Sequence, residues 1–75
     1  MEMHPCRYSG QVAAFGYDPK TEELRIRFHA GGTYAYKAVP QAVFMAFLHA
    51  RSKGGFVNHA IKGHYDFERL EEEPE

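Results

Sequence analysis

Apolar and polar residues alternate in the middle of this chain. Leu24, Ile26 and Phe28 are separated by single arginines, and this period of two predicts a strand with one buried face. The glycines at 31 and 32 predict a turn that reverses the chain, because glycine readily adopts the positive φ angles of tight turns. Residues 33–38 then predict the returning strand of a hairpin.

An earlier strand is predicted for residues 11–17. Its bulky apolar residues begin with Val12 and Phe15, and the three-residue step between them breaks the alternation. Such a break is typical of a β-bulge, which we expect near residues 13–14. Residues 18–21 predict the turn into the next strand, since proline presets φ and aspartate bonds the backbone ahead of it.

The second half of the chain changes to a helical period. Pro40 suits the first position of a helix, which we expect to run to about Arg51. Ser52 predicts the cap of a second helix, because its hydroxyl accepts from free backbone N–H groups, and Gly63 stands where a helix commonly ends. The expected core stripes of these helices are Val43, Phe44, Phe47 and Leu48, then Phe56, Val57, Ala60 and Ile61.

The first turn of the second helix contains two poor helix formers. Gly54 and Gly55 each lower helix stability by about 1 kcal/mol relative to alanine. We expect a compensating reason, either tight packing of the backbone or the close approach of a ligand. Asn58, a little further on, is expected either to form a hydrogen bond across to the corner between strand and helix or to bind a ligand.

The length of the glycine turn decides which face of the sheet the tyrosines occupy. A two-residue loop pairs Arg27 with Tyr34 or Tyr36 and sets the rings beside the arginines. A three-residue loop pairs Phe28 with Tyr34 and Ile26 with Tyr36, which joins the rings to the apolar face. Burial favours the second register. It leaves one group of side chains on the open face of the sheet: Arg25, Arg27, His29 and Lys37.

These elements predict an α+β domain. A three-stranded antiparallel β-meander is packed on one face by two helices, in the order βββαα. Residues 1–9 are expected to form an N-terminal arm, residues 10–65 the domain, and residues 66–75 an acidic C-terminal tail, disordered from residue 71 onward. The predicted core is Val12, Leu24, Ile26, Phe28, Tyr34, Tyr36, Val43, Phe44, Phe47, Leu48, Phe56, Val57 and Ile61.

Composition restricts the class of protein. Seventy-five residues suffice for one small domain, whose thin core depends on its six Phe and five Tyr residues. The single cysteine, Cys6, excludes an internal disulfide, so nothing points to an oxidising compartment. No apolar run approaches the roughly 20 residues of a membrane span, and the first residues do not resemble a signal peptide. We expect a cytoplasmic protein without membrane contact.

The charges are divided unevenly along the chain. Residues 1–65 carry a formal charge of +4, whereas residues 66–75 carry −5, which together give the net charge of −1. A basic body with an acidic tail is compatible with nucleic-acid binding. It is equally typical of a small protein that is kept soluble by a charged, solvated tail.

Several motifs follow one another at characteristic spacings. They are Gly16-Tyr17-Asp18, Leu24-x-Ile26-x-Phe28, Gly31, Tyr34-Ala35-Tyr36, Val39-Pro40, and Ser52-x-Gly54-x-x-x-Asn58-x-x-Ile61. The set resembles the KTSC domain, which is named for the C-terminal domain of some lysyl-tRNA synthetases and also occurs as a small stand-alone bacterial protein. The resemblance covers about residues 10–65. It implies the fold and, through the synthetase, RNA binding; it implies no aminoacylation, because the catalytic domain is absent.

Two groups of residues are candidates for nucleic-acid binding. The cationic residues expected on the open sheet face, Arg25, Arg27, His29 and Lys37, are suited to phosphate contacts, although exposed strands need charged residues in any case. The second candidate is the helix start at Ser52, Lys53 and Gly54, where free N–H groups and the helix dipole attract anions. An ordinary serine cap at a tight corner explains the same residues.

The two tyrosines of the last strand have two interpretations. Tyr34 and Tyr36 can stack on unpaired bases, as aromatic side chains do in single-stranded RNA complexes. They can instead be core residues, which the favoured register supports. The sequence leaves both possibilities open.

The sequence gives little support to catalysis or metal binding. The five histidines show no spacing typical of a metal site, and Cys6 has no residue placed to activate it. We expect no cofactor, no metal and no enzymatic activity. The leading hypothesis is a small non-catalytic module that binds RNA. The alternative is a protein-interaction module, an adaptor or homodimer, that docks through an edge strand or through Met45 and His49 of the first helix.

Overall fold

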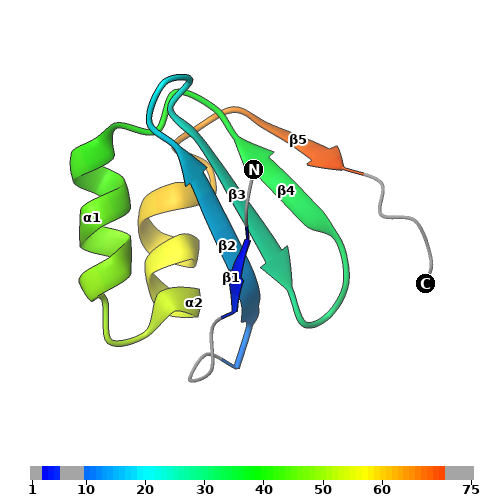
Figure 1. Cartoon of the computed structure of the whole chain (residues 1–75). Coiled ribbons are helices and arrows are strands. Elements are labelled where there is room, and N and C mark those ends of the chain that lie inside the picture. Colours follow the sequence, from blue (N-terminus) through cyan, green and yellow to red (C-terminus); the bar gives the residue numbers. More distant parts are fainter. Residues whose placement is uncertain (1–2, 6–9, 71–75) are drawn as a thin grey trace.

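The sheet of this protein has five antiparallel strands rather than three. The computed structural model describes residues 3–5 and 10–70. The strands follow one another in the sheet in chain order, β1-β2-β3-β4-β5 (Figure 1). Their bounds are β1 His4–Pro5, β2 Val12–Asp18, β3 Glu23–Phe28, β4 Thr33–Tyr36 and β5 Phe67–Leu70. The predicted α+β class is confirmed, and the predicted number of strands is wrong.

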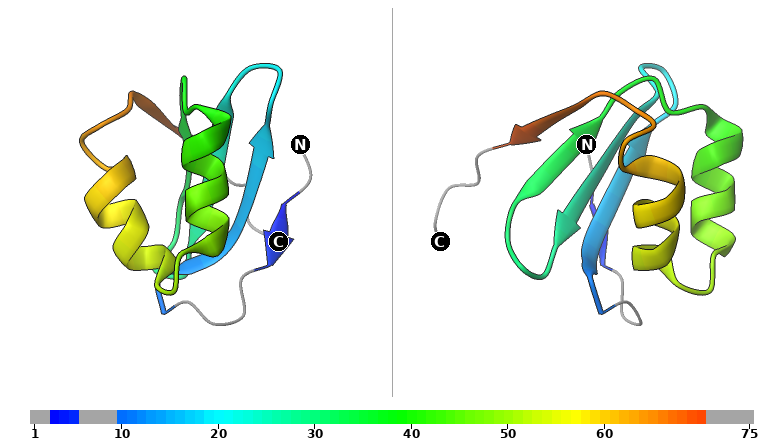
Figure 2. Two further views of the ribbon diagram at one scale, coloured as in Figure 1. Left: turned by 90° about the vertical axis from the view of Figure 1, so that its left-hand side faces the viewer. Right: turned by 180° about the vertical axis from the view of Figure 1, so that it is seen from behind.

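Two helical segments cover one face of this sheet. Helix α1 spans Gln41–His49, and α2, Lys53–Phe56, continues directly into η1, a π-helix at Val57–Ile61. Both segments lie on the same side of the sheet, while β5 lies at the far edge from α1 (Figures 1 and 2). The first helix is therefore slightly shorter than predicted. The second changes its hydrogen-bonding pattern halfway, which no sequence period indicated.

The two unpredicted strands are at the edges of the sheet, in segments where the sequence analysis predicted no strand. His4 and Pro5 pair with Phe15 and Ala14 of β2, inside the expected N-terminal arm. Strand β5 lies inside the expected acidic tail and pairs with β4 through the backbone, while most of its side chains are exposed. Backbone pairing needs no apolar alternation, so β1 left no signal in the sequence, and β5 left only the short alternation of Phe67, Glu68 and Arg69. Cys6 and the tail from residue 71 lie outside the described residues.

The hairpin between β3 and β4 has the predicted face but a different register. Ile26 pairs with Tyr34 and Leu24 with Tyr36, a shift of two residues from the expected pairs. The N–H of Phe28 donates to Gly32 O at 3.1 Å, so the three-residue loop begins one position earlier than expected. A shift of two preserves side-chain direction. The tyrosines therefore face the helices, as predicted, and the expected bulge appears between Val12 and Ala14.

The core lies between the helices and strands β2, β3 and β4. Phe47 is fully buried at its centre, and its ring lies 5.1 Å from Phe15 and 6.0 Å from Phe56, centroid to centroid. Phe15 and Val39 are buried although the sequence did not place them in the core. Other predicted core residues pack at its margin and are only partly buried: Phe28, Tyr34, Val43, Phe44, Leu48 and Phe56.

Strand β5 contributes stability through Phe67. Its ring lies 5.5 Å from that of Tyr34 and 5.8 Å from that of Tyr36. A chain ending at Asp66 is expected to lose roughly 1–3 kcal/mol of unfolding free energy, since each aromatic pair is worth about 0.5–1.5 kcal/mol. A chain ending at Leu70 keeps the strand and is the matched control. Urea denaturation of the two measures the difference, and equal midpoints would show that β5 adds no stability.

Candidate functional site

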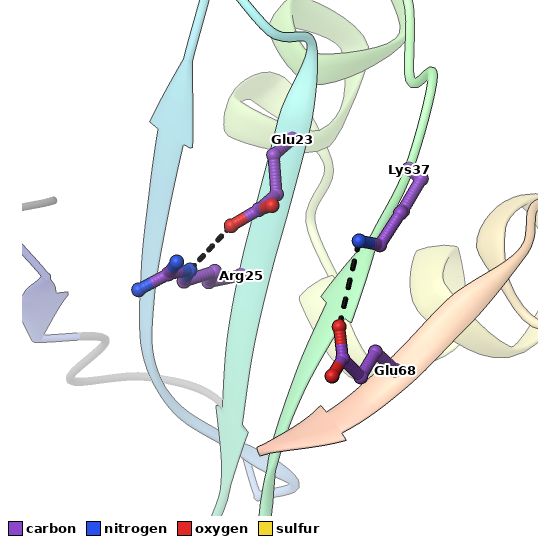
Figure 3. A network of polar contacts seen from close by, with 4 residues as sticks. All are labelled: Glu23, Arg25, Lys37 and Glu68. Atoms are coloured by element: carbon purple, nitrogen blue, oxygen red, sulfur yellow. Dashed lines mark hydrogen bonds and ion pairs between the residues drawn. The ribbon is translucent and has the colours of Figure 1, made fainter.

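The predicted cationic residues of the sheet are on its open face, but carboxylates accompany them. Arg25 forms an ion pair with Glu23 of the same strand, and Lys37 Nζ lies 3.5 Å from Glu68 Oε2 of β5 (Figure 3). Arg27 and His29 are exposed further along, at the end of β3 and in the following loop. Paired carboxylates reduce the positive potential of this surface, so it is a weaker phosphate site than the sequence indicated.

The predicted corner at Ser52, Lys53 and Gly54 is built into the fold. Ser52 Oγ accepts from the Gly55 N–H at 3.0 Å, as expected of a helix cap. Lys53 Nζ donates to Leu48 O at 3.1 Å, at the end of α1. This corner belongs to the helical layer, whereas Arg25 and Arg27 alternate along β3 with the buried Leu24 and Ile26 and so lie on the opposite face of the sheet. The structure therefore does not bring the two groups of predicted residues together.

Gly54 is explained by close packing. The residue is buried, and a Cβ added there would lie 2.8 Å from Gln11 Oε1 and 3.0 Å from Gln11 Cβ. The backbone of α2 thus approaches the start of β2 so closely that a larger residue would require Gln11 to shift. Of the two reasons expected for this glycine, packing is the one that the structure provides.

A pocket of about 540 Å³ opens where the helices no longer cover the sheet. Its walls are the inward face of β3, β4 and β5 on one side and the end of η1 on the other. The start of β2 and the β3–β4 loop close the remaining sides. The lining residues are Gly10, Gln11, Phe28, Ala30, Gly31, Tyr34, Tyr36, Asn58, Lys62, Gly63 and Phe67.

Aromatic rings form the sheet side of this pocket. Tyr34 is half-buried at the centre, with the ring of Phe28 at 5.6 Å on one side and that of Phe67 at 5.5 Å on the other. Tyr36 is almost fully buried beneath them, whereas Phe67 is 58% exposed. The two interpretations of the tyrosines therefore separate: Tyr36 is a core residue, and Tyr34 joins the core to an exposed aromatic surface.

The charged side chains at this surface are cationic. Lys62 Nζ lies 5.0 Å from the centroid of the Phe28 ring, and Arg69 Cζ lies 5.8 Å from that of Tyr34. Both distances are within the range of cation–π attraction. Among the lining residues that the structure describes, none is acidic. The pocket thus combines exposed rings with positive charge.

Two amide side chains meet at the helical wall. Asn58 Nδ2 donates to Gln11 Oε1 at 3.2 Å, which ties η1 to the start of β2. The prediction that Asn58 forms a hydrogen bond to the strand–helix corner is therefore wrong, because its partner is Gln11 at the start of β2. The Lys62 N–H donates to Val57 O at 2.8 Å, five residues back, which is the hydrogen bond of a π-helix. Such segments occur frequently at functional sites.

Sequence reasoning missed two charged or aromatic lining residues, Lys62 and Phe67, and also Arg69, which lies over the ring of Tyr34. Lys62 lies just after the apolar stripe of the predicted second helix, so nothing in the sequence marked it as a binding residue. Phe67 and Arg69 were assigned to the acidic tail. The alternation in Phe67-Glu68-Arg69 was the available signal. It sends Phe67 and Arg69 to the face of Tyr36 and Tyr34, and Glu68 to the opposite one.

The other candidate surfaces are simpler. Met45 is 44% exposed on the outer side of α1, together with His49, and no residue within the described parts of the chain covers them. Within residues 3–5 and 10–70, no three metal-ligating side chains gather into a cluster. No helix in that part of the chain is long and apolar enough to cross a bilayer.

Comparisons with known proteins agree on one family. The model of the KTSC domain matches residues 8–65. A protein from Tsukamurella paurometabola is 46% identical over 54 residues, which cover 72% of this chain and 81% of that protein. A lysine–tRNA ligase from Nostoc punctiforme is 41% identical over 59 residues, 79% of this chain but 10% of the ligase. The crystal structure of a KTSC domain protein from Yersinia pestis superposes with a TM-score of 0.89 at 34% identity, covering 93% of this chain and 97% of that one.

The packing at Gly54 predicts the effect of an added methyl group. Gly54→Ala gains about 1 kcal/mol of helix propensity, but overpacking costs about 1–3 kcal/mol. We therefore expect the variant to unfold at lower urea concentration than the parent. Gly10→Ala is the control, since a Cβ there meets nothing within 4 Å. Unchanged or higher stability of Gly54→Ala would show that Gln11 moves aside freely.

The burial of Tyr36 predicts a loss of stability in alkali. Burial, and to a smaller extent the neighbouring Tyr34, raises the pKa of Tyr36 above the usual tyrosine value of 10.0. The folded state therefore holds this proton more tightly than the unfolded chain. Its contribution is complete below pH 10 and declines as the pH rises further. Urea midpoints measured between pH 9 and 11 should fall less steeply in Tyr36→Phe than in Tyr65→Phe, and parallel slopes would contradict the assignment.

Proposed function

The chain belongs to the KTSC domain family, and we propose that it is a small non-catalytic module that binds RNA. Its binding site is the aromatic pocket between η1 and the β4–β5 edge of the sheet. In this proposal Tyr34 and Phe67 stack on unpaired bases, while Lys62 and Arg69 attract the backbone phosphates. The site differs from the open sheet face and the helix corner that the sequence indicated.

One observation carries this proposal: the rings of Tyr34 and Phe67 lie at the same pocket as the cations of Lys62 and Arg69. Phe67 is 58% exposed although its ring contacts Tyr34 and Tyr36. The exposed ring of Phe67 and the half-buried ring of Tyr34 together offer one apolar surface on which a flat ligand can stack. Stacking on such rings is worth roughly 1–3 kcal/mol per base and suits single-stranded nucleic acids.

The size and charge of the pocket fit a nucleotide. Its volume of about 540 Å³ lies within the roughly 300–1,000 Å³ that is usual for small-ligand sites. Lys62 and Arg69 lie over rings of the same surface, so they stand beside any base that stacks there. A polyanion is therefore attracted to the place where its bases find aromatic partners.

The relatives support an RNA partner. The ligase from Nostoc punctiforme is named for the joining of lysine to tRNA, and a region of it resembles most of this chain. That region is 10% of the ligase, so the ligase reaction itself is not proposed here. A module that accompanies an enzyme acting on tRNA is suited to holding RNA.

Binding of labelled single-stranded RNA and tRNA, measured by fluorescence anisotropy at two salt concentrations, tests the proposal. Tyr34→Ala and Phe67→Ala are each expected to weaken binding by roughly 5- to 150-fold, which corresponds to the loss of one stacked base. Lys62 and Arg69 together should give a log–log salt slope of about −1.4, since each phosphate contact to a single strand contributes about −0.7.

The control is the double variant Arg25→Glu with Arg27→Glu on the open face. If this variant alone abolishes binding, the RNA site is on the open sheet face and the pocket assignment is wrong. If no RNA binds under any condition, the RNA function itself is wrong. The protein-interaction hypothesis then remains, for which Met45→Asp should abolish the capture of a partner or a second copy.

A further inference from the structure

We propose that the acidic segment, residues 71–75, competes with RNA for the aromatic pocket, and that its carboxylates pair with Lys62 and Arg69 until RNA displaces them. The inference rests on the proposed RNA-binding function and adds a regulation of the same site. The segment itself lies outside the described residues. What the structure places is the point from which it starts and the charges around that point.

The two cations of the pocket have no acidic partner among the described residues. On the open face of the sheet, by contrast, Lys37 pairs with Glu68. Lys62 and Arg69 make cation–π contacts at 5.0 and 5.8 Å, and no carboxylate that the structure describes forms an ion pair with either of them. Their charge is therefore available to an anion, whether it comes from RNA or from this chain.

The acidic segment starts beside these cations. Strand β5 runs toward the β3–β4 loop, and its last residue, Leu70, pairs with Thr33 at the start of β4. The guanidinium of Arg69 lies at the same loop, because its atoms stand 3.4 Å from the position of a Cβ added to Gly32. Residue 71 therefore follows directly at the loop that closes one side of the pocket.

Lys62 is within reach of the segment. Its ammonium lies over Phe28, the last residue of β3, and Leu70 stands two strands away on β5. Neighbouring strands are about 4.8 Å apart, so the two positions are separated by roughly 10 Å. Five residues span up to about 17 Å, which is enough for the glutamates to meet both cations.

The charges of the segment and the pocket are complementary. Residues 71–75 read Glu-Glu-Glu-Pro-Glu and carry four carboxylates against the two cations of the pocket. An exposed ion pair is weak, but a segment tethered beside its partners gains from a high effective concentration. A glutamate offers no ring for stacking. A ligand with both bases and phosphates therefore displaces the segment, whereas an anion without bases has only its charge with which to compete.

Neutralising the segment tests the inference. A variant with Glu71→Gln, Glu72→Gln, Glu73→Gln and Glu75→Gln keeps the length of the chain and loses four charges. At low ionic strength we expect it to bind labelled single-stranded RNA roughly two- to thirtyfold more tightly than the parent, the combined effect of two exposed ion pairs. The difference should fall below about twofold at 1 M salt, where the Debye length is about 3 Å.

A second background separates local pairing from the general repulsion between two anions. In the double variant Lys62→Met with Arg69→Met, neutralising the segment should change RNA affinity by less than about twofold, because the cations with which it pairs are gone. Lys20→Met, in the β2–β3 turn at the far end of the strands, is the matched charge control and should keep the full effect. An undiminished effect in the double variant would show that the segment acts through net charge alone and would overturn the inference.

Cross-linking observes the pairing without RNA. A carbodiimide joins a carboxylate to a lysine amine in direct contact, and peptide mass spectrometry of the parent should find residues 71–75 joined to Lys62 rather than to Lys20. Single-stranded RNA in excess should suppress this link. Links to Lys62 no more frequent than those to Lys20 would overturn the inference and leave RNA binding by the pocket intact. If the link forms but no RNA binds to any variant, the proposed function and the competition both fall.

Discussion

The packing of Phe47 determines how much of the sheet the helices cover. This side chain is fully buried and brings its ring to Phe15 of β2, Phe44 of α1 and Phe56 of α2. A core this small depends on a few large rings, so both helical segments are held around one point. That point lies over β2 rather than at the centre of the five strands. The inward face of β5, and that of β4 around Tyr34, is consequently less covered by the helices.

The aromatic residues therefore divide into two groups with different surroundings. Around Phe47 they are enclosed between the layers and exclude water. Around Tyr34 they line a pocket whose opposite wall is polar, with Asn58 and Lys62 across the opening. Tyr36 belongs to both groups, since it is almost fully buried and still borders the pocket.

Much of this fold could be predicted from the sequence, because the period of the apolar residues and the positions of the turn residues indicated the same strands and helices. The alternation at Leu24, Ile26 and Phe28 gave the central strand and its buried face, and the helix stripe gave the buried position of Phe47. The glycine turn gave the right loop length but not its first residue, because both glycines have positive φ and permit neighbouring registers. The side-chain directions were predicted correctly in spite of this error, because the register between β3 and β4 shifted by an even number of residues.

The edge strands and the pocket could not be predicted from the sequence, because they depend on backbone pairing between distant segments of the chain. Strand β5 consists mainly of exposed residues, and its partner lies some thirty positions earlier, in β4. Because β5 was not predicted, the sequence analysis did not place Phe67 or Arg69 next to Tyr34. It therefore did not predict the pocket. The cationic open face was visible, but the carboxylate of Glu68 that opposes Lys37 arrives with the same unpredicted strand.

The π-helix at Val57–Ile61 has a consequence for how this surface can diverge among relatives. Its wider turn accommodates one more residue per hydrogen-bonded loop than an α-helix does. Loss of a single residue from this segment would restore ordinary α-helical geometry and rotate everything after it by about 100° relative to the preceding turn. Lys62 would then leave the mouth of the cavity, and the fully buried Ile61 of the same segment would shift with it. A one-codon deletion is thus a short evolutionary route to a pocket without this lysine, at the cost of repacking around Ile61.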